Sequence, residues 1–537
     1  MLFNSYEFIF LFLPIVLIGF FLIGGKGHHR IAISWLVAAS LFFYGWWNPA
    51  YLGLMLFSIL FNYGVGVFLC NVTNHNALKR YMLIIGVVVN LSVLGYFKYF
   101  NFFIENINNI ANTNINFQQV ILPLAISFFT FQQIAYLVDA FRGKTKEYNF
   151  LHYCLFVTFF PQLIAGPIVH HKEMMPQFCN DFIYKINARN ISIGITIFFI
   201  GLFKKVVIAD NLATYATPVF NASELGLEIT FLEAWAGAIA YSFQLYFDFS
   251  GYSEMALGIA RMFGIILPVN FFSPFKATNI ADFWRRWHIT LSNFIKDYLF
   301  YPVNIVMTRY AILNKYNKIG EFLITVLVPM MIAWFLAGLW HGSNWTFVIF
   351  GLMHGCYLIV YRIYLDIRYL IFSKGGKSGI FSTALLRMFM FFIVTMSFVM
   401  FRSESVNGAI SMYKSMVGGR GISVSSWFES KMAVLGDIPN ILGVRYDGFF
   451  YNGILTSNPE NLILFLAFLF FIVWFSPNVI ELFRLNNPAL GVDVLLKNAK
   501  NRILWNINIY FLIATVILSV VSIMFVQQES EFIYFNF

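Results

Sequence analysis

The stretch LAGLWHG, residues 336–342, places a histidine inside an otherwise apolar part of the chain. The apolar run 326–340 precedes His341, and a second apolar run, 345–361, follows it almost at once. An ionisable group at membrane depth is costly and usually serves a function. Histidine also gains and loses a proton near neutral pH, as general acid–base catalysis requires. The residue alone allows two readings, a hydrogen-bonded core imidazole or a catalytic base.

The composition around this stretch is that of a membrane protein. Of 537 residues, 59% are hydrophobic and only 11% are charged, whereas a soluble domain carries roughly 25% charged residues. Apolar runs of about 20 residues, the length of a membrane-spanning helix, recur from end to end. They are continuous, unlike the short alternating strands of an outer-membrane barrel. We therefore expect an all-α polytopic membrane protein with about eleven to thirteen transmembrane or re-entrant helices.

Several other classes of protein are disfavoured. The net charge of +10 comes from short loops and not from a dense basic tract, so no nucleic-acid partner is expected. The four cysteines have no paired spacing, and no HExxH motif is present, so we expect neither a disulfide nor a metal site. A Walker loop, a GxSxG nucleophile elbow, a GxGxxG fingerprint and an HxxxxD arrangement are also absent from the sequence.

The positions of the basic loops predict the topology. Residues 1–7 contain no Lys or Arg, so we read 8–24 as a retained span that starts outside and ends at the basic loop 26–30. A hairpin over 31–70, turning at 46–49, and a span over 81–103 leading to the loop 105–119 continue this alternation. The last span, 503–525, enters from the inside. Both termini are therefore predicted to be extracytoplasmic, in the bacterial cytoplasmic (inner) membrane.

The alternation of apolar spans and loops becomes irregular between 148 and 301. The segment 160–167 holds two prolines and a glycine in apolar surroundings, and Asp248 is flanked by aromatic residues. Broken segments at membrane depth are tolerated where they face protein or a water-filled cavity, so we expect this region to line a cavity. Residues 403–461 form the most polar long loop. No boundary divides the chain, which predicts one membrane domain over 1–537 with its catalytic region at about 280–360.

The densest polar and aromatic cluster is ADFWRRWH, residues 281–288. One interpretation is an interfacial anchor helix, because Trp and Arg are both common at the membrane surface. The functional interpretation is that Arg285 and Arg286 hold the phosphates of an anionic donor such as coenzyme A, with His288 lining the same cavity.

A further histidine, His354, lies 13 positions after His341. On one unbroken helix the two would be about 220° and ~20 Å apart and would face different ways. A break at residues 342–344 would change this relationship. We therefore leave channel lining and simple packing open for His354.

These motifs together resemble the membrane-bound O-acyltransferase family. The motifs WRRWH (284–288) and LAGLWHG (336–342) carry the resemblance, with MLFNS (1–5), GP (166–167), FKK (203–205), ADNL (209–212) and YFDFSG (246–251) in matching order. The chain is most similar to the bacterial alginate O-acetylase branch, which includes peptidoglycan O-acetyltransferases and the D-alanyl transferase of teichoic acids. The resemblance implies a ring of helices around a central funnel or tunnel.

The resemblance also implies a site and a reaction. The essential histidine of the family falls on His341, and a second polar position, Asn in many relatives, falls on His288. The donor-binding candidates are, besides the two arginines, Trp284, Asp248, Trp340 and His354. Such proteins move an acyl group from a cytoplasmic thioester, here acetyl-CoA as substrate with no bound cofactor, towards an acceptor outside the membrane.

The expected acceptor is a cell-envelope polysaccharide, either peptidoglycan or an alginate-like glycan. The expected partner is a separate extracytoplasmic acetyltransferase or acyl-accepting protein, and the tail 529–537, including Tyr534, is a candidate docking or acyl-carrying segment. A transporter or channel is the alternative, because buried polar residues on broken helices suit it equally well. The chain shows no inverted-repeat hydropathy pattern to support that alternative.

Overall fold

The structure is a computed structural model of residues 1–537. Its description covers the chain except for residues 73–75, 147–148, 372–379, 425–428, 442, 447–458, 498–502, 527–532 and 534–537. Helices form nearly all the regular structure of these described residues. The named strands there are β1 (Ile422–Ser423) and β2 (Val444–Arg445), which pair in parallel. The all-α prediction is confirmed.

Seven helices in the described part of the chain are long and apolar enough to cross a membrane. They are Glu7–Gly24, Ala50–Asn71, Asn76–Ala111, Ala188–Glu224, Lys318–His341, Trp345–Tyr369 and Phe381–Arg402. Two shorter apolar helices cover Asn461–Phe475 and Ile509–Phe525. The protein is therefore a multi-pass membrane protein. The expected total of eleven to thirteen included re-entrant pieces, and that total, the ring and the funnel remain predictions.

The chain divides into two compact units, each assembled from segments distant in sequence. The first contains Met1–Val207, Phe249–Asn270 and Pro477–Phe537, and the second contains Ile208–Asp248 and Phe271–Ser476. The long helix α12 (Phe231–Met262) contributes residues to both. The expected single domain over 1–537 stays a prediction.

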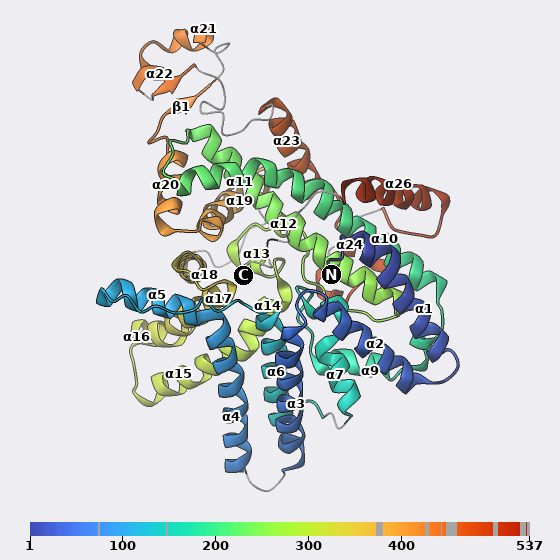
Figure 1. Ribbon diagram of the computed structural model, residues 1–537. Helices are drawn as coiled ribbons and strands as arrows, with labels where there is room; N and C mark the ends of the chain where they lie inside the picture. The colour runs from blue at the N-terminus through green and yellow to red at the C-terminus, as the bar shows by residue number, and fades with distance from the viewer. Residues whose placement is uncertain are drawn as a thin grey trace. The chain divides into compact units, whose positions relative to one another are not determined.

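The first unit holds the N-terminal and C-terminal helices (Figure 1). Its α-helices besides part of α12 are α1 (Leu13–Gly24), α2 (His29–Gly45), α3 (Ala50–Asn71), α4 (Asn76–Leu94), α5 (Phe100–Ala111), α6 (Ile126–Phe141), α7 (Phe150–Thr158), α8 (Phe160–Leu163), α9 (His171–Phe178), α10 (Ala188–Phe203), α24 (Val479–Leu482), α25 (Asp493–Leu496) and α26 (Ile509–Phe525). Its 3₁₀ and π turns are η1 (Glu7–Phe12), η2 (Gly95–Tyr99), η3 (Asp181–Tyr184), the start of η4 (Lys204–Ala209) and η10 (Arg484–Asn486).

The second unit holds the motif helices. Its α-helices besides part of α12 are α11 (Asp210–Glu224), α13 (Ile280–Trp284), α14 (Ile289–Phe294), α15 (Tyr301–Leu313), α16 (Lys318–Phe322), α17 (Val328–His341), α18 (Trp345–Ile371), α19 (Ile380–Arg402), α20 (Val406–Met416), α21 (Glu429–Met432), α22 (Ile438–Ile441) and α23 (Pro459–Phe475). Its short turns are η5 (Pro274–Lys276), η6 (Ile295–Phe300), η7 (Leu323–Leu327) and η9 (Ala433–Leu435).

Within the first unit, α10 and α12 cross with their backbones in contact. A Cβ atom on Gly201 would lie 2.5 Å from the carbonyl oxygen of Gly251, and one on Gly194 would lie 2.6 Å from that of Gly258. On each helix the two glycines are seven residues apart, which is close to two turns, so they lie on the same helix face. Small residues of this kind allow close helix packing in membranes.

A hydrogen-bonded polar cluster joins α3, α4 and α6, which lie side by side (Figure 1). The side-chain amides of Asn62 and Asn90 donate to each other's oxygens over 3.1 and 2.6 Å. Gln133 Nε2 donates to Ser58 Oγ over 2.8 Å, and Gln133 Oε1 accepts from the Tyr153 hydroxyl. Polar side chains buried between membrane helices hold them together when their hydrogen bonds are made in this way.

Three of the local expectations can be compared with the structure. The hairpin over 31–70 is confirmed as α2 and α3 with its turn at 46–49. The proline-rich segment 160–167 is broken as expected, since α8 has only four residues. The loop expected over 105–119 is wrong in its first part, because α5 continues to Ala111 and ends where Asn112 takes a left-handed conformation.

Candidate active site

The motif LAGLWHG forms the end of α17, and His341 is its last residue. The next residue, Gly342, is extended, so the helix stops there. The side-chain oxygen of Asn344 accepts a hydrogen bond from Thr346 N over 3.1 Å, at the start of α18. Its amide nitrogen donates to the Glu404 carbonyl over 2.6 Å, which ties the break to the end of α19. The break that the sequence left open at 342–344 is present in the structure.

Two glycines let α17 and α18 pack backbone to backbone. A Cβ atom on Gly338 would lie 2.4 Å from the Phe347 carbonyl oxygen, and one on Gly351 would lie 2.2 Å from that of Trp334. The two helices make the most extensive contact of any pair in the described chain (Figure 1). This packing fixes the position of His341 at the end of α17 relative to α18.

His341 is buried against aromatic rings from α17, α18 and α19. Its ring centroid lies 5.0 Å from Trp340, 5.9 Å from Phe350 and 5.2 Å from Phe401. Phe350 belongs to α18 and Phe401 to α19. Rings at these distances exclude water from much of the imidazole, and a base that works on a reactive thioester benefits from that exclusion.

His288 reaches the same neighbourhood from a different part of the chain. It is fully buried between α13 and α14, and its ring lies 5.9 Å from that of Trp340. The Trp340 ring therefore contacts both the His288 and the His341 rings. His288 has φ 43° and ψ 54°, a left-handed conformation. Such strain costs about 1–3 kcal/mol in a residue with a side chain and is concentrated at functional sites.

His354 belongs to this cluster as well, because α17 and α18 are separate helices. The angular separation of about 220° between His341 and His354, which holds for one unbroken helix, therefore does not apply. Its ring lies 4.6 Å from Phe350, which also contacts His341. Trp284 Nε1 donates a hydrogen bond to His354 Nδ1 over 3.2 Å.

That hydrogen bond fixes the tautomer of His354. An indole nitrogen is only a donor, so His354 Nδ1 must be the acceptor, and the neutral ring carries its proton on Nε2. Within the described chain no partner takes up this buried Nε2 atom. A buried donor without an acceptor costs about 1–3 kcal/mol, which favours an oxygen atom of a bound substrate as its partner.

The two arginines of the cluster have different surroundings. Arg286 Nε donates to Asp282 over 2.9 Å, and its guanidinium lies 5.8 Å above the Phe272 ring. Arg285 is exposed, and no ion pair of its side chain is found among the described residues. Arg286 therefore holds the local fold, and a role of Arg285 in binding an anionic donor stays a prediction.

Asp248 is buried on α12 within the same unit. Tyr246, two residues earlier, packs against Phe271 and Trp287 with ring centroids 6.2 and 6.3 Å apart. This part of α12 therefore lies against the segment that carries His288. A role of Asp248 in donor binding stays a prediction.

The sequence reading named Trp340 but missed Phe350 and Phe401, the other aromatic residues that contact His341. Phe350 was detectable, because it lies four residues before His354 on one helix, a spacing that places side chains on the same face. Phe401 had no comparable signal, since nothing in the sequence pairs α19 with His341. No group of three or more potential metal ligands is found in the part of the chain that the structure describes.

Comparison with known proteins identifies the class. Residues 82–403 match the membrane-bound O-acyltransferase family. The chain is 44% identical to the peptidoglycan O-acetyltransferase of Helicobacter pylori over 452 residues, covering 79% of this chain and 81% of that protein. It is 37% identical to a probable alginate O-acetylase of Azotobacter vinelandii over 422 residues, or 78% of each chain.

A more distant relative is the teichoic acid D-alanyltransferase of Bacillus subtilis. It is 32% identical over 248 residues, which cover 45% of this chain and 59% of that protein. These matches show that the chain belongs to the membrane-bound O-acyltransferase family and is an acyltransferase. The family resemblance read from the sequence is confirmed.

Proposed function

We propose that this acyltransferase moves an acetyl group from cytoplasmic acetyl-CoA across the membrane for the O-acetylation of a cell-envelope polysaccharide. The observation that carries the proposal is that His288 and His341 both contact the Trp340 ring in a buried aromatic cluster. Relatives named as O-acetyltransferases of peptidoglycan and alginate support the choice of acyl group and acceptor.

In the proposed reaction, His341 acts as the general base. Its neutral imidazole takes the proton of an acceptor hydroxyl, and the oxygen attacks the thioester carbonyl carbon. The carbon–sulfur bond then breaks, and the coenzyme A thiolate recovers the proton from the imidazolium. The products are an acetyl ester and free coenzyme A. In this proposal, His354 Nε2–H donates a hydrogen bond to the carbonyl oxygen, where negative charge develops.

The acceptor on the outer side is either the glycan itself or an acyl-accepting partner protein that passes the group on. Peptidoglycan is the first acceptor to test, because the relative that modifies it shares more sequence with this chain than the alginate relatives do. This proposal includes the bacterial cytoplasmic membrane as the location and extracytoplasmic N- and C-termini. The tail 534–537, expected to be a docking segment, lies outside the described residues.

The test is an assay of purified protein in lipid nanodiscs with acetyl-CoA labelled in the acetyl group. Wild type is expected to cleave the thioester when a soluble glycan fragment is present, and His341→Ala is expected to lose about 10²–10⁴-fold in rate. Equal turnover by the two proteins would refute the role of His341. Glycan acetylation in cells, measured after gene deletion and complementation, identifies the acceptor.

The transporter alternative is set aside, because the family and the relatives are acyltransferases. Detection of a labelled product ester distinguishes transfer from the transporter alternative. If acetyl-CoA is cleaved without a labelled product ester on any glycan or protein acceptor, the transfer reaction proposed here does not take place.

A further inference from the structure

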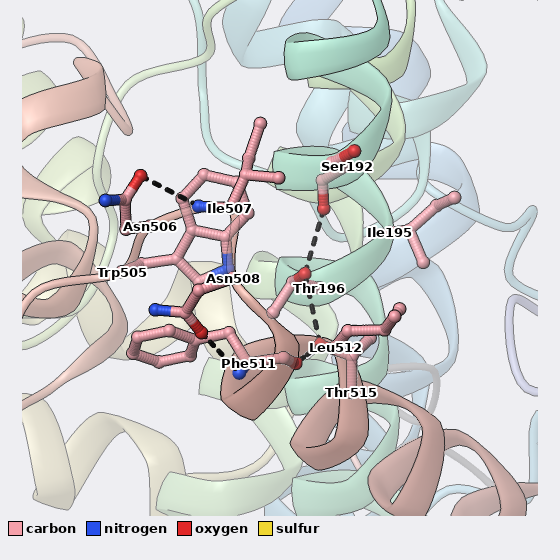
Figure 2. A pocket seen from close by; sticks show the side chains of 10 residues that line it. All are labelled: Ser192, Ile195, Thr196, Trp505, Asn506, Ile507, Asn508, Phe511, Leu512 and Thr515. Carbon is pink, nitrogen blue, oxygen red and sulfur yellow. Dashed lines mark hydrogen bonds between the residues drawn. The ribbon is translucent and has the colours of Figure 1, made fainter.

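A groove lies between α10 and the segment that leads into α26, within the first compact unit (Figure 2). Ile195 of α10 and Leu512 of α26 contribute apolar walls, and Trp505 lines the end opposite Ile195 (Figure 2). On its floor, the hydroxyl oxygens of Thr196 and Thr515 are 3.3 Å apart, at hydrogen-bonding distance. The groove is therefore mostly apolar.

The polar groups that line the groove are largely occupied. Thr196 Oγ1 donates to the Ser192 carbonyl over 2.9 Å. The side-chain oxygens of Asn508 and Asn506 accept hydrogen bonds from the backbone nitrogens of Phe511 and Ile507, both over 2.9 Å (Figure 2). These contacts leave little polar surface for a small hydrophilic ligand.

Trp505 is the exception. Its side chain is only 5% exposed, and its ring stacks on Phe483 at 5.1 Å. Its backbone nitrogen donates to the Leu482 carbonyl over 2.9 Å, so the residue is held firmly. Within the described chain, no group accepts a hydrogen bond from its Nε1–H. An acceptor atom from a ligand would stabilise a buried indole donor of this kind.

Two arginines meet next to this end of the groove. Arg189 lies three residues before Ser192, a spacing that puts both on one face of α10. Its Nε and Nη2 donate to Asn486 Oδ1 over 3.2 and 2.8 Å, and Arg261 Nη2 donates to the Asn486 carbonyl over 3.0 Å. Asn486 follows Phe483, the ring on which Trp505 stacks, by three residues.

The positive charges of these arginines are not neutralised by a described carboxylate. Neither Arg189 nor Arg261 forms an ion pair in the part of the chain that the structure describes. Burial, followed by the charge of Arg189, lowers the pKa of the Arg261 guanidinium, which lies at the end of α12, a helix that is not among the seven apolar spans. Two guanidinium groups that repel each other are stabilised by an anion bound between them.

We propose that the groove binds one anionic glycerophospholipid of the surrounding bilayer. Its phosphate lies against Arg189 and Arg261, an ester carbonyl oxygen accepts from Trp505 Nε1, and an acyl chain follows Ile195 and Leu512. α26 is an apolar helix whose side chains are mostly exposed, so lipid is what surrounds it in a membrane. The charge complementarity selects an anionic headgroup.

The experiment is native mass spectrometry of the full-length protein, equilibrated in micelles with equal amounts of phosphatidylglycerol and phosphatidylcholine. Wild type is expected to retain one phosphatidylglycerol. The double variant R189Q/R261Q is expected to retain about tenfold less, as the loss of charge-assisted hydrogen bonds predicts. Trp505→Phe keeps the ring but removes the N–H donor, and Leu512→Trp fills the groove, so each should also weaken retention.

Matched controls separate this site from general membrane effects. Arg309 and Trp46 are exposed on α15 and beside α2, so Arg309→Gln and Trp46→Phe should leave retention unchanged. Equal retention of the two lipids by wild type would overturn the proposal, as would undiminished retention by R189Q/R261Q. Displacement of the lipid by inorganic phosphate alone would also overturn it, because the site would then be a simple anion site. Thermal unfolding in detergent identifies any variant that fails to fold.

Discussion

Trp284 and His354 are joined by a hydrogen bond from the indole Nε1 to the imidazole Nδ1 over 3.2 Å. The bond connects the tryptophan–arginine motif to the helix that follows His341. It also sets the proton of His354 on Nε2, where it can meet a substrate oxygen. Thus two residues far apart in sequence define one chemical property of the candidate site.

Trp284→Phe tests whether this hydrogen bond fixes the tautomer of His354. The substitution keeps an aromatic ring against Trp334 but frees His354 Nδ1, so acetyl transfer is expected to fall about tenfold with little change in KM for acetyl-CoA. The readout is the kcat of thioester cleavage. His354→Gln, which restores a donor nitrogen near the Nε2 position, should retain more activity than His354→Leu. If His354→Leu matches wild type, the ring has only a packing role.

Substitutions of His288 test the strained backbone between α13 and α14. Asn tolerates a left-handed conformation better than Ala does, so His288→Asn should fold normally while His288→Ala loses about 1 kcal/mol of stability. Both variants remove the imidazole and are expected to slow acetyl transfer. Thermal unfolding and the transfer assay are measured on the same preparations. Full activity in His288→Ala would remove this residue from the site.

Asn344 tests the helix break that positions His341. Asn344→Asp keeps the oxygen that caps α18 but loses the N–H bond to the Glu404 carbonyl, whereas Asn344→Ala loses both. Losing a cap costs about 1 kcal/mol, so stability should fall more in Asn344→Ala. Activity should fall in both, because the turn after His341 loosens. Rescue of kcat by Asn344→Asp would show that only the cap matters.

Gly201 lies at the α10–α12 crossing, and Gly64 on α3 serves as its control for a glycine-to-alanine substitution. A Cβ atom on Gly201 meets the Gly251 carbonyl oxygen at 2.5 Å, whereas one on Gly64 meets nothing within 4 Å. Gly201→Ala is therefore expected to destabilise the protein by about 1–3 kcal/mol. Gly64→Ala should be neutral or stabilising by up to about 1 kcal/mol, because alanine favours a helix. Unfolding temperatures in one detergent measure both, and equal shifts would contradict the close crossing.

Substitutions at Arg285 and Arg286 are expected to have different effects, the first on donor binding and the second on stability. Arg285→Gln should raise the KM for acetyl-CoA about tenfold without changing the unfolding temperature, since the exposed side chain supports no described ion pair. Arg286→Gln should instead lower the unfolding temperature, because it removes the bond to Asp282. An equal rise in KM for the two variants would show that both contact the donor.

Much of the fold followed from composition and periodicity alone. Long apolar runs must pair their backbone groups internally in a membrane, which makes them helices wherever they occur. The α2–α3 hairpin and the broken segment at α8 were predicted from these runs and from the prolines and glycines that interrupt them, whereas the break after His341 was left open. The family was predicted from the order of its motifs and is confirmed.

The internal arrangement of the site was decided by tertiary structure. The sequence marked His288, His341 and His354 as separate candidates, and only folding brought their rings into contact with the shared aromatic rings of Trp340 and Phe350. Helical spacing predicts which side chains share one helix face, but contacts between helices depend on how closely backbones approach. Here that approach is set by glycines such as Gly338, whose missing side chain lets α18 close on α17.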